Sequence, residues 1–270
     1  MNPSSHPTRR AGFTLIELIV SMAVLTIMLT MVLQITNSAR NAVKLTESKS
    51  NNDAIARRAF DRISRDLAQI VIRDDARIEF KSNPGNDQIA FLTRAKGFTA
   101  AGDAGDRDVS LVSYSILYDA TAGERLLRGS CGNLFAVASP AALKLDASLP
   151  FSAVSPDNLQ LLSNNVIRFE VEYLIQGASG VTQEITAPAT SQNLRGLVIT
   201  LVTLDDWGRR AIKPDHLESL TANFTDAATG KQTLKTWSLK RDELAKSGIA
   251  GLPKDALQSI RCYQRTFMIQ

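Results

Sequence analysis

The sequence predicts an α+β protein in which one long N-terminal helix packs against an antiparallel β-sheet head. Two observations support this fold class. No proline or glycine occurs from Thr14 to Ile72, so one long helix is the simplest interpretation of that stretch. After residues 73–75 the apolar residues change from helical spacing to alternation with polar residues, which is typical of half-buried strands.

The first half of the expected helix has the composition of a membrane span. The 23 residues from Phe13 to Ile35 contain one charged residue, Glu17. A helix of about 20 apolar residues crosses a hydrocarbon core of about 30 Å. A carboxylate at membrane depth costs about 2.5 kcal/mol or more, so Glu17 is expected to have a partner or a function.

The second half of the helix, up to residue 72, is amphipathic. An apolar stripe recurs at steps of three and four residues: Ile55, Ala59, Ile63, Leu67 and Ile70. The other face is expected to be solvated and carries the charged residues Arg57, Asp61, Arg62, Arg65 and Asp66. Alternatively, these charges could set the register between neighbouring helices of a fibre. The apolar stripe must be covered by the rest of the chain.

The remainder of the chain is expected to be rich in strands. The expected strands are residues 76–81, 88–93, 109–118, 124–128, 166–175, 194–203 and 261–269. Asn83-Pro-Gly-Asn86 indicates a hairpin turn, and a phase slip in 109–118 suggests a bulge. The expected loops are 97–108, 129–157 and 177–191. The β-branched residues of 194–203 favour a central position in the sheet. The C-terminal sixty or so residues mix helical pieces with breaks, including a short helix at 255–259.

Composition limits the possible functions. The 270 residues are 44% hydrophobic and 21% charged, which suits a globular core. The net charge of +4 includes Arg9 and Arg10, and without the first twelve residues 29 basic residues face 27 acidic ones, so nucleic acid is not implied. Outside those twelve residues His216 is the one histidine, which disfavours most acid–base and zinc chemistry. Neither an enzymatic activity nor a cofactor is expected.

A short motif stands at the start of the apolar run. Gly12 lies two residues after the basic pair Arg9-Arg10, and the sequence continues Phe13-Thr-Leu-Ile-Glu17-Leu18. The run is too long for an ordinary secretory signal, and no Ala-x-Ala site ends it. The motif resembles the class III signal of type IV pilins and type II secretion pseudopilins, although Ala11 stands where many members have Lys or Arg.

This resemblance implies a pilin fold and a processing scheme. A prepilin peptidase would cleave between Gly12 and Phe13 and methylate the new amine of Phe13. Glu17 would then pair with the terminal amine of a neighbouring subunit, which supplies the cation that a buried carboxylate requires. The implied divisions are a leader (1–12), a transmembrane and assembly half-helix (13–35), an amphipathic half-helix (36–72) and a periplasmic head (73–270).

The head is similar, more loosely, to the minor pseudopilin J and minor pilin W group. The similarity lies in the segments 112–114, 126–128, 169–173 and 197–201, whereas Leu194-Arg-Gly196 replaces a proline that commonly precedes the last of these strands. It implies a minor structural subunit of a type II secretion or type IV pilus fibre, and the large head favours a minor role. The expected partners are other pilin subunits and an inner-membrane assembly platform. The expected location is the bacterial inner membrane, crossed once, with the head in the periplasm.

Two further groups of residues are candidates for sites. Asp103, Asp106 and Asp108 form a weak calcium candidate, although Arg107 opposes a cation and a solvated loop is the preferred interpretation. Cys131 and Cys262 form a possible disulfide if the head lies in an oxidising compartment. Gly129-Ser-Cys-Gly132 lacks the spacing of a nucleophile turn, so no catalytic residue is expected.

A different class of function is also compatible with the sequence. The chain could be an uncleaved membrane-anchored envelope protein with a binding or enzymatic head. That alternative predicts an intact N-terminus and tolerance of Glu17→Ala.

Overall fold

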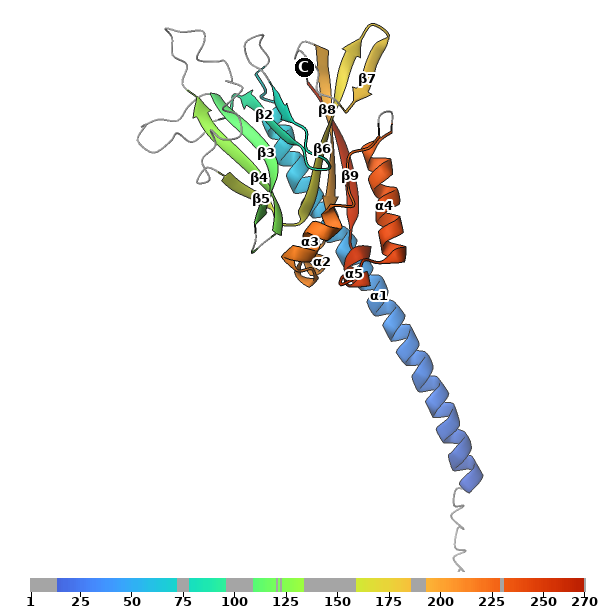
Figure 1. The fold of residues 1–270 in the computed structure, drawn as a ribbon. Coiled ribbons are helices and arrows are strands. Elements are labelled where there is room, and N and C mark those ends of the chain that lie inside the picture. The colour runs from blue at the N-terminus through green and yellow to red at the C-terminus, as the bar shows by residue number, and fades with distance from the viewer. Residues whose placement is uncertain are drawn as a thin grey trace, which may run out of the picture. The chain divides into compact units, whose positions relative to one another are not determined.

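The computed structural model describes most of the chain, in two compact units, Met1–Glu47 and Ser48–Gln270. The described residues are 14–71, 78–95, 109–119, 121, 123–133, 159–185, 193–228 and 231–269. The element order is one long helix, eight strands, four shorter helices and a final strand within these ranges (Figure 1). The expected α+β class, with a long N-terminal helix and antiparallel sheets, is confirmed.

Helix α1 (Leu15–Leu67) is the long helix that the sequence predicts, and its 53 residues contribute to both units. In the second unit its buried face contains Ala56, Ala59, Phe60, Ile63 and Leu67. Full burial of a side chain such as Ile63 contributes about 1.5–3 kcal/mol. The expected apolar stripe is therefore confirmed, with Ile55 and Ile70 half-buried against the same cluster.

The C-terminal end of the helix comes earlier than expected. α1 ends at Leu67 rather than near residue 72. The backbone then pairs with the first sheet: Ile70 forms a bridge with Thr93, and the Val71 N–H donates to the Leu92 carbonyl at 2.8 Å. Extended pairing ends the helix here, although no proline or glycine marks the position.

The first sheet has five antiparallel strands in sequential order. They are β1 (Glu79–Lys81), β2 (Gln88–Thr93), β3 (Val109–Asp119), β4 (Gly123–Asn133) and β5 (Leu159–Ser163). The β1–β2 hairpin turns where it is expected, because the Asn86 N–H donates to the Asn83 carbonyl and Gly85 takes a φ of 68°. A positive φ favours glycine, which has no Cβ.

The second sheet has four antiparallel strands in the order β7-β6-β8-β9. They are β6 (Val166–Gly177), β7 (Gly180–Glu184), β8 (Leu194–Thr203) and β9 (Arg261–Met268). β8 pairs with both β6 and β9, so its expected central position is confirmed. The antiparallel head thus contains two sheets, and both contribute residues to the core against α1.

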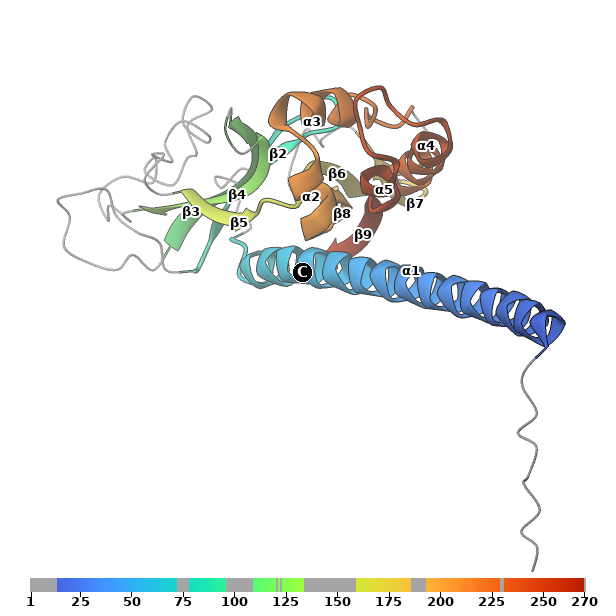
Figure 2. The same cartoon turned by 90° about the horizontal axis from the view of Figure 1, so that it is seen from below.

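Four short helices cover the other face of the second sheet (Figure 2). They are α2 (Asp206–Ala211), α3 (Pro214–Thr221), α4 (Thr233–Ser247) and α5 (Lys254–Gln258). Their apolar residues, Trp237, Leu217 and Leu257 among them, pack with Val202 and Leu204 of the sheet end. Strands β6 and β8 are therefore largely buried between the second half of α1 on one face and these helices on the other, whereas β7 is mostly exposed.

Several expected boundaries differ from the structure. The bulge expected in 109–118 is absent, because β3 stays in continuous register with both β2 and β4. The alternation of apolar and polar residues breaks in this segment because both faces of β3 are buried. Val112 and Tyr114 lie in the core against α1, and Leu111 lies in a second buried cluster. Strand β4 continues to Asn133, and β5 and β7 were not expected.

Candidate functional site

Glu17 begins α1 together with Thr14. The backbone N–H and the hydroxyl of Thr14 each donate to Glu17 Oε2 at 3.2 Å, and the Glu17 N–H donates to Thr14 Oγ1 at 3.4 Å. This reciprocal pair is a capping box, in which a Thr and a Glu three residues later satisfy the N–H groups at the start of a helix. Glu17 therefore has a role in its own chain, which the Thr-x-x-Glu pattern indicates and the sequence analysis missed.

The following helical segment exposes a continuous apolar surface in the first unit. Fifteen large apolar side chains between Leu15 and Ile35 are each at least 46% exposed. The hydroxyls of Thr26 and Thr36 donate to helix carbonyls at 2.7 and 2.8 Å, so these groups are satisfied within the helix. α1 is also the one described helix that is long and apolar enough to cross a membrane. Lipid or other apolar helices are the environments that suit such a surface.

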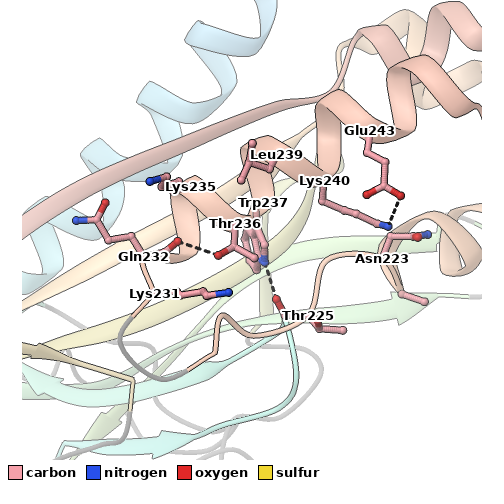
Figure 3. Close-up of a pocket in the computed structure, with 11 residues that line it drawn as sticks. Asn223, Thr225, Lys231, Gln232, Lys235, Thr236, Trp237, Leu239, Lys240 and Glu243 are labelled. Carbon is pink, nitrogen blue, oxygen red and sulfur yellow. Dashed lines mark hydrogen bonds and ion pairs between the residues drawn. The ribbon is translucent and has the colours of Figure 1, made fainter.

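A cleft of about 1030 Å³ lies in the head beside α4. It is lined by Ala222, Asn223, Thr225, Lys231, Gln232, Lys235, Thr236, Trp237, Leu239, Lys240 and Glu243. Figure 3 shows Lys231, Gln232 and Lys235 at one end and the Lys240–Glu243 ion pair beside Asn223 at the other. Trp237 is 1% exposed and donates its indole N–H to the Thr225 carbonyl at 2.7 Å, so it forms part of the core rather than a free aromatic surface.

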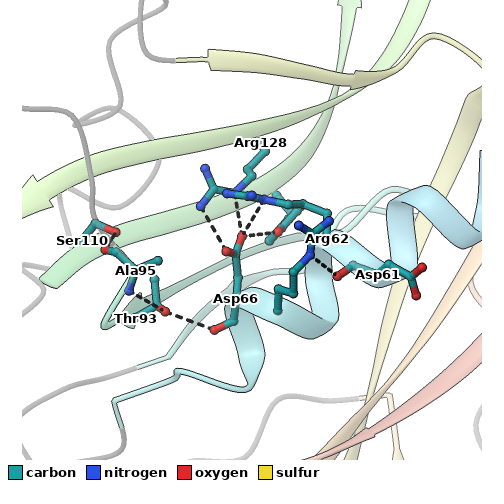
Figure 4. A network of polar contacts seen from close by, with 9 residues as sticks. Asp61, Arg62, Asp66, Thr93, Ala95, Ser110 and Arg128 are labelled. Carbon is teal, nitrogen blue, oxygen red and sulfur yellow. Dashed lines mark hydrogen bonds and ion pairs between the residues drawn. The ribbon is translucent and has the colours of Figure 1, made fainter. Parts of the chain in front are cut away.

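A buried polar network joins the last turn of α1 to the first sheet (Figure 4). Asp66 is 2% exposed, and its Oδ2 accepts from Arg128 Nε at 2.6 Å and from the Tyr114 hydroxyl at 2.5 Å. Arg128 Nη2 donates to the other oxygen at 3.2 Å. Burial, and then the Asp66 charge, raise the pKa of Tyr114, so its hydroxyl remains a donor. The prediction that Asp66 lies on the solvated face is wrong, because Arg128 and Tyr114 provide a buried partner for it.

A second polar contact fixes α1 to the other sheet. Asn52 is fully buried, and its Nδ2 donates to the Ser259 carbonyl at 3.0 Å. Its Oδ1 accepts from the Thr203 hydroxyl at 2.5 Å. Nearby, the Tyr263 hydroxyl donates to Asp53 Oδ1 at 2.5 Å. Polar bonds at both ends of the buried segment therefore set the position of the helix on the two sheets.

A group of carboxyls is buried beside β6. Glu170 is fully buried, and neither of its carboxyl oxygens has a hydrogen-bond partner among the described residues. Burial, and then the charges of Asp87, Asp226 and Glu172, raise the pKa of Glu170 to about 10. Burial also raises the pKa of Asp87 to about 6, although its oxygens accept from the Val171 and Asn83 N–H groups. Within the described ranges, no group of three His, Cys, Asp or Glu residues could hold a metal ion.

The expected site residues have different outcomes. Gly12 and Phe13 lie outside the described residues, as do Asp103, Asp106 and Asp108. Cys262 on β9 is a free thiol, and burial raises its pKa to about 11. Cys131 lies on β4 of the other sheet. Cys262 packs against the buried cluster that α2–α5 cover, and the side chain of Cys131 lies outside those that the structure describes, so the possible disulfide stays a prediction.

Comparison with known proteins concerns the N-terminus first. Residues 7–33 match the family model described as the prokaryotic N-terminal methylation motif, so the chain carries the prepilin-type motif. Among solved structures, the chain is similar to a type IV-like pilin from Thermus thermophilus, with 15% identity and a TM-score of 0.37. That alignment covers 81% of this chain and 94% of the other. Comparison with curated proteins gave no significant match.

Proposed function

We propose that this chain is a structural subunit that enters a helical fibre of the pilin or pseudopilin type through its N-terminal helix. The observation that carries the proposal is the match of residues 7–33 to the methylation motif. In the structure, the same segment begins a helix with an exposed apolar surface and contains the single acidic residue Glu17. A head that packs its core against the second half of this helix suits a structural role rather than an enzymatic one.

The processing follows from the motif. In this proposal residues 1–12 are a leader, the prepilin peptidase cuts between Gly12 and Phe13, and the amine of Phe13 is methylated. Residues 13–35 are the transmembrane and assembly half of the helix, 36–72 its amphipathic half and 73–270 the periplasmic head. The precursor crosses the inner membrane once and then joins the fibre with the help of an assembly platform.

Glu17 is the proposed assembly residue. A carboxylate has two oxygens that accept several hydrogen bonds, so Glu17 can cap its own helix through Oε2 and accept a neighbour's terminal amine through Oε1. Without a cation, a charged carboxylate among apolar helices carries a large desolvation penalty. Pairing of Glu17 with a neighbour's terminal amine therefore favours one axial offset between neighbouring subunits in the fibre.

The subunit is proposed to be a minor one, of a type II secretion fibre or a type IV pilus. The support is the bulk of the head, which would crowd its copies in a fibre. Deletion separates the two machines: loss of enzyme export with surface fibres intact supports secretion, and the reverse result supports a pilus.

The first prediction concerns the N-terminus. In cells with the prepilin peptidase, mass spectrometry of the purified chain is expected to find an N-terminal methylated Phe13. In cells without the peptidase the N-terminus is expected to remain Met1. An intact Met1 in both strains would refute the fibre proposal and favour an uncleaved envelope anchor.

The second prediction separates the two roles of Glu17. Glu17→Ala is expected to abolish incorporation into fibres, measured by the amount of the chain in sheared or cross-linked fibre fractions. The melting temperature of the head is expected to be unchanged, because Glu17 and the head core lie in different compact units. Glu47→Ala, a matched change of an exposed acid on α1, is expected to assemble normally.

Glu17→Gln makes this test specific for charge. Glutamine retains an acceptor for the Thr14 N–H, so it preserves the capping box but provides no charge for a neighbouring amine. It is expected to fail in assembly as alanine does. Normal assembly of Glu17→Gln would show that capping is sufficient and would contradict the pairing.

A further inference from the structure

The cleft beside α4 has an excess of positive charge. Of its four charged lining residues, Lys240 and Glu243 neutralise one another at 3.1 Å. Lys231 and Lys235 form no ion pair with any residue that the structure describes, and both are exposed. The remaining charge of two lysines is concentrated at the end of the cleft that Gln232 also lines (Figure 3).

The start of α4 lies at the same end of the cleft. Gln232 is the N-cap of α4 and makes no side-chain cap hydrogen bond. The next residue, Thr233, donates its N–H and its hydroxyl to the buried Glu172 carboxylate at 3.4 and 2.9 Å. The helix start therefore already has an anionic partner within the head, and the charge that the cleft offers to a ligand is that of Lys231 and Lys235.

The other lining groups favour a peptide over a nucleic acid. The cations are lysines, and Trp237 is 1% exposed, so the cleft presents no aromatic face on which a base could stack. Leu239 is 63% exposed and offers an apolar contact at the rim. The side chains of Thr225 and Gln232 can donate to and accept from a peptide backbone. Asn223 can accept through Oδ1, because its Nδ2 already donates to the carbonyls of Ser219 and Leu220. At about 1030 Å³, the volume is at the upper end of the range for ligand sites.

We propose that this cleft binds an acidic peptide segment of a partner protein, with its carboxylates against Lys231 and Lys235 and its backbone along α4. The interaction does not depend on the N-terminal helix or on fibre formation, so it stands or falls separately from the proposed function.

The test uses the full chain in zwitterionic nanodiscs and a fluorescein-labelled hexaglutamate peptide, followed by fluorescence anisotropy. Saturable binding of one peptide per chain is expected. Lys231→Gln with Lys235→Gln is expected to weaken binding about tenfold, with a smaller difference at higher salt because exposed charges are screened. Both residues are exposed, so circular dichroism and melting are expected to be unchanged.

Two further variants make the result specific. Lys213→Gln with Lys254→Gln removes the same charge from exposed positions outside the cleft and is expected to leave affinity unchanged. Glu243→Gln releases Lys240 from its ion pair and is expected to strengthen binding about two- to fivefold. A gain in peptide affinity from Glu243→Gln would not be expected if Lys240 and Glu243 had a purely structural role.

Three results would overturn the proposal. They are an absence of saturable binding, equal weakening by the two double lysine variants, and tighter binding of a single-stranded oligonucleotide of the same charge. The last would assign the cleft to nucleic acid instead.

Discussion

Replacing Arg128 with alanine is expected to lower the free energy of unfolding of the head by about 3–5 kcal/mol. The change leaves the Asp66 carboxylate buried at 2% exposure, with a hydrogen bond from the Tyr114 hydroxyl and, as its cation, the partly exposed Arg62 at a longer distance of 3.6 Å. A buried charge without its partner retains its desolvation penalty and loses the compensating attraction. Urea unfolding of the full chain in detergent micelles, followed by tryptophan fluorescence, measures the loss.

Arg125→Ala provides a matched control on the same strand. Arg125 pairs with Asp119 at 2.6 Å, as short as the Arg128–Asp66 contact, but both side chains are about one-third exposed. Exposed ion pairs contribute about 0–1 kcal/mol. Equal losses for Arg125→Ala and Arg128→Ala would contradict the role given to burial.

A double change separates the ion pair from general packing. Asp66→Asn with Arg128→Met replaces the charges by groups of similar size, and the introduced amide can still accept from the Tyr114 hydroxyl. The double variant is expected to be more stable than Arg128→Ala, since no charge remains buried. A double variant that is as unstable as Arg128→Ala would indicate that shape, rather than charge, dominates.

This network matters for the proposed function because it fixes the last turn of α1 to the first sheet. A subunit that is held in a fibre by its N-terminal helix transmits force to its head through the buried part of that helix. Asp66 connects this part to β3 and β4, and Asn52 connects it to β8 and to the turn after α5. The two contacts act on different sheets, so they secure both halves of the head.

The fold was predictable where a local pattern was strong. The absence of glycine and proline gave the long helix, and β8 spans the predicted residues 194–203 because its dense β-branched residues are typical of a buried strand. β5 and β7 were missed, since both are edge strands that have no fully buried residue and lack a clear alternation. α4 buries only Thr233, Trp237 and Leu244. That spacing is too sparse to indicate a helix of its length.

The division into two sheets and the burial of Asp66 could not be predicted. Both depend on contacts between residues that are far apart in the sequence. Asp66 meets Arg128, a residue 62 positions away, and no local feature distinguishes it from its solvated neighbours. At the N-terminus the motif is local. It predicted the importance of Glu17 and, through Thr14, contained the capping box as well.

Glu170→Gln is expected to stabilise the head at alkaline pH and to flatten its dependence on pH. Burial raises the pKa of Glu170 from 4.5 to about 10, so the folded chain holds a proton that the unfolded chain has released. The free energy of unfolding therefore falls as pH rises from 4.5 towards 10, by up to about 1.4 kcal/mol per pH unit from this group. Glutamine resembles the protonated carboxyl and does not titrate, so this slope is lost.

The pH window isolates Glu170 from other shifted groups. Asp87 changes its protonation in the folded state near pH 6, and the Cys262 thiol of the unfolded chain ionises around its ordinary pKa of 9.0, so measurements between about pH 6.5 and 8 avoid both. Asp226→Asn removes one of the charges that raise the pKa of Glu170, so the fall in stability is expected to end at a lower pH. Parallel urea-unfolding curves for wild type and Glu170→Gln across this window would show that Glu170 is ionised in the folded head. In that case its burial would have to be compensated by a cation.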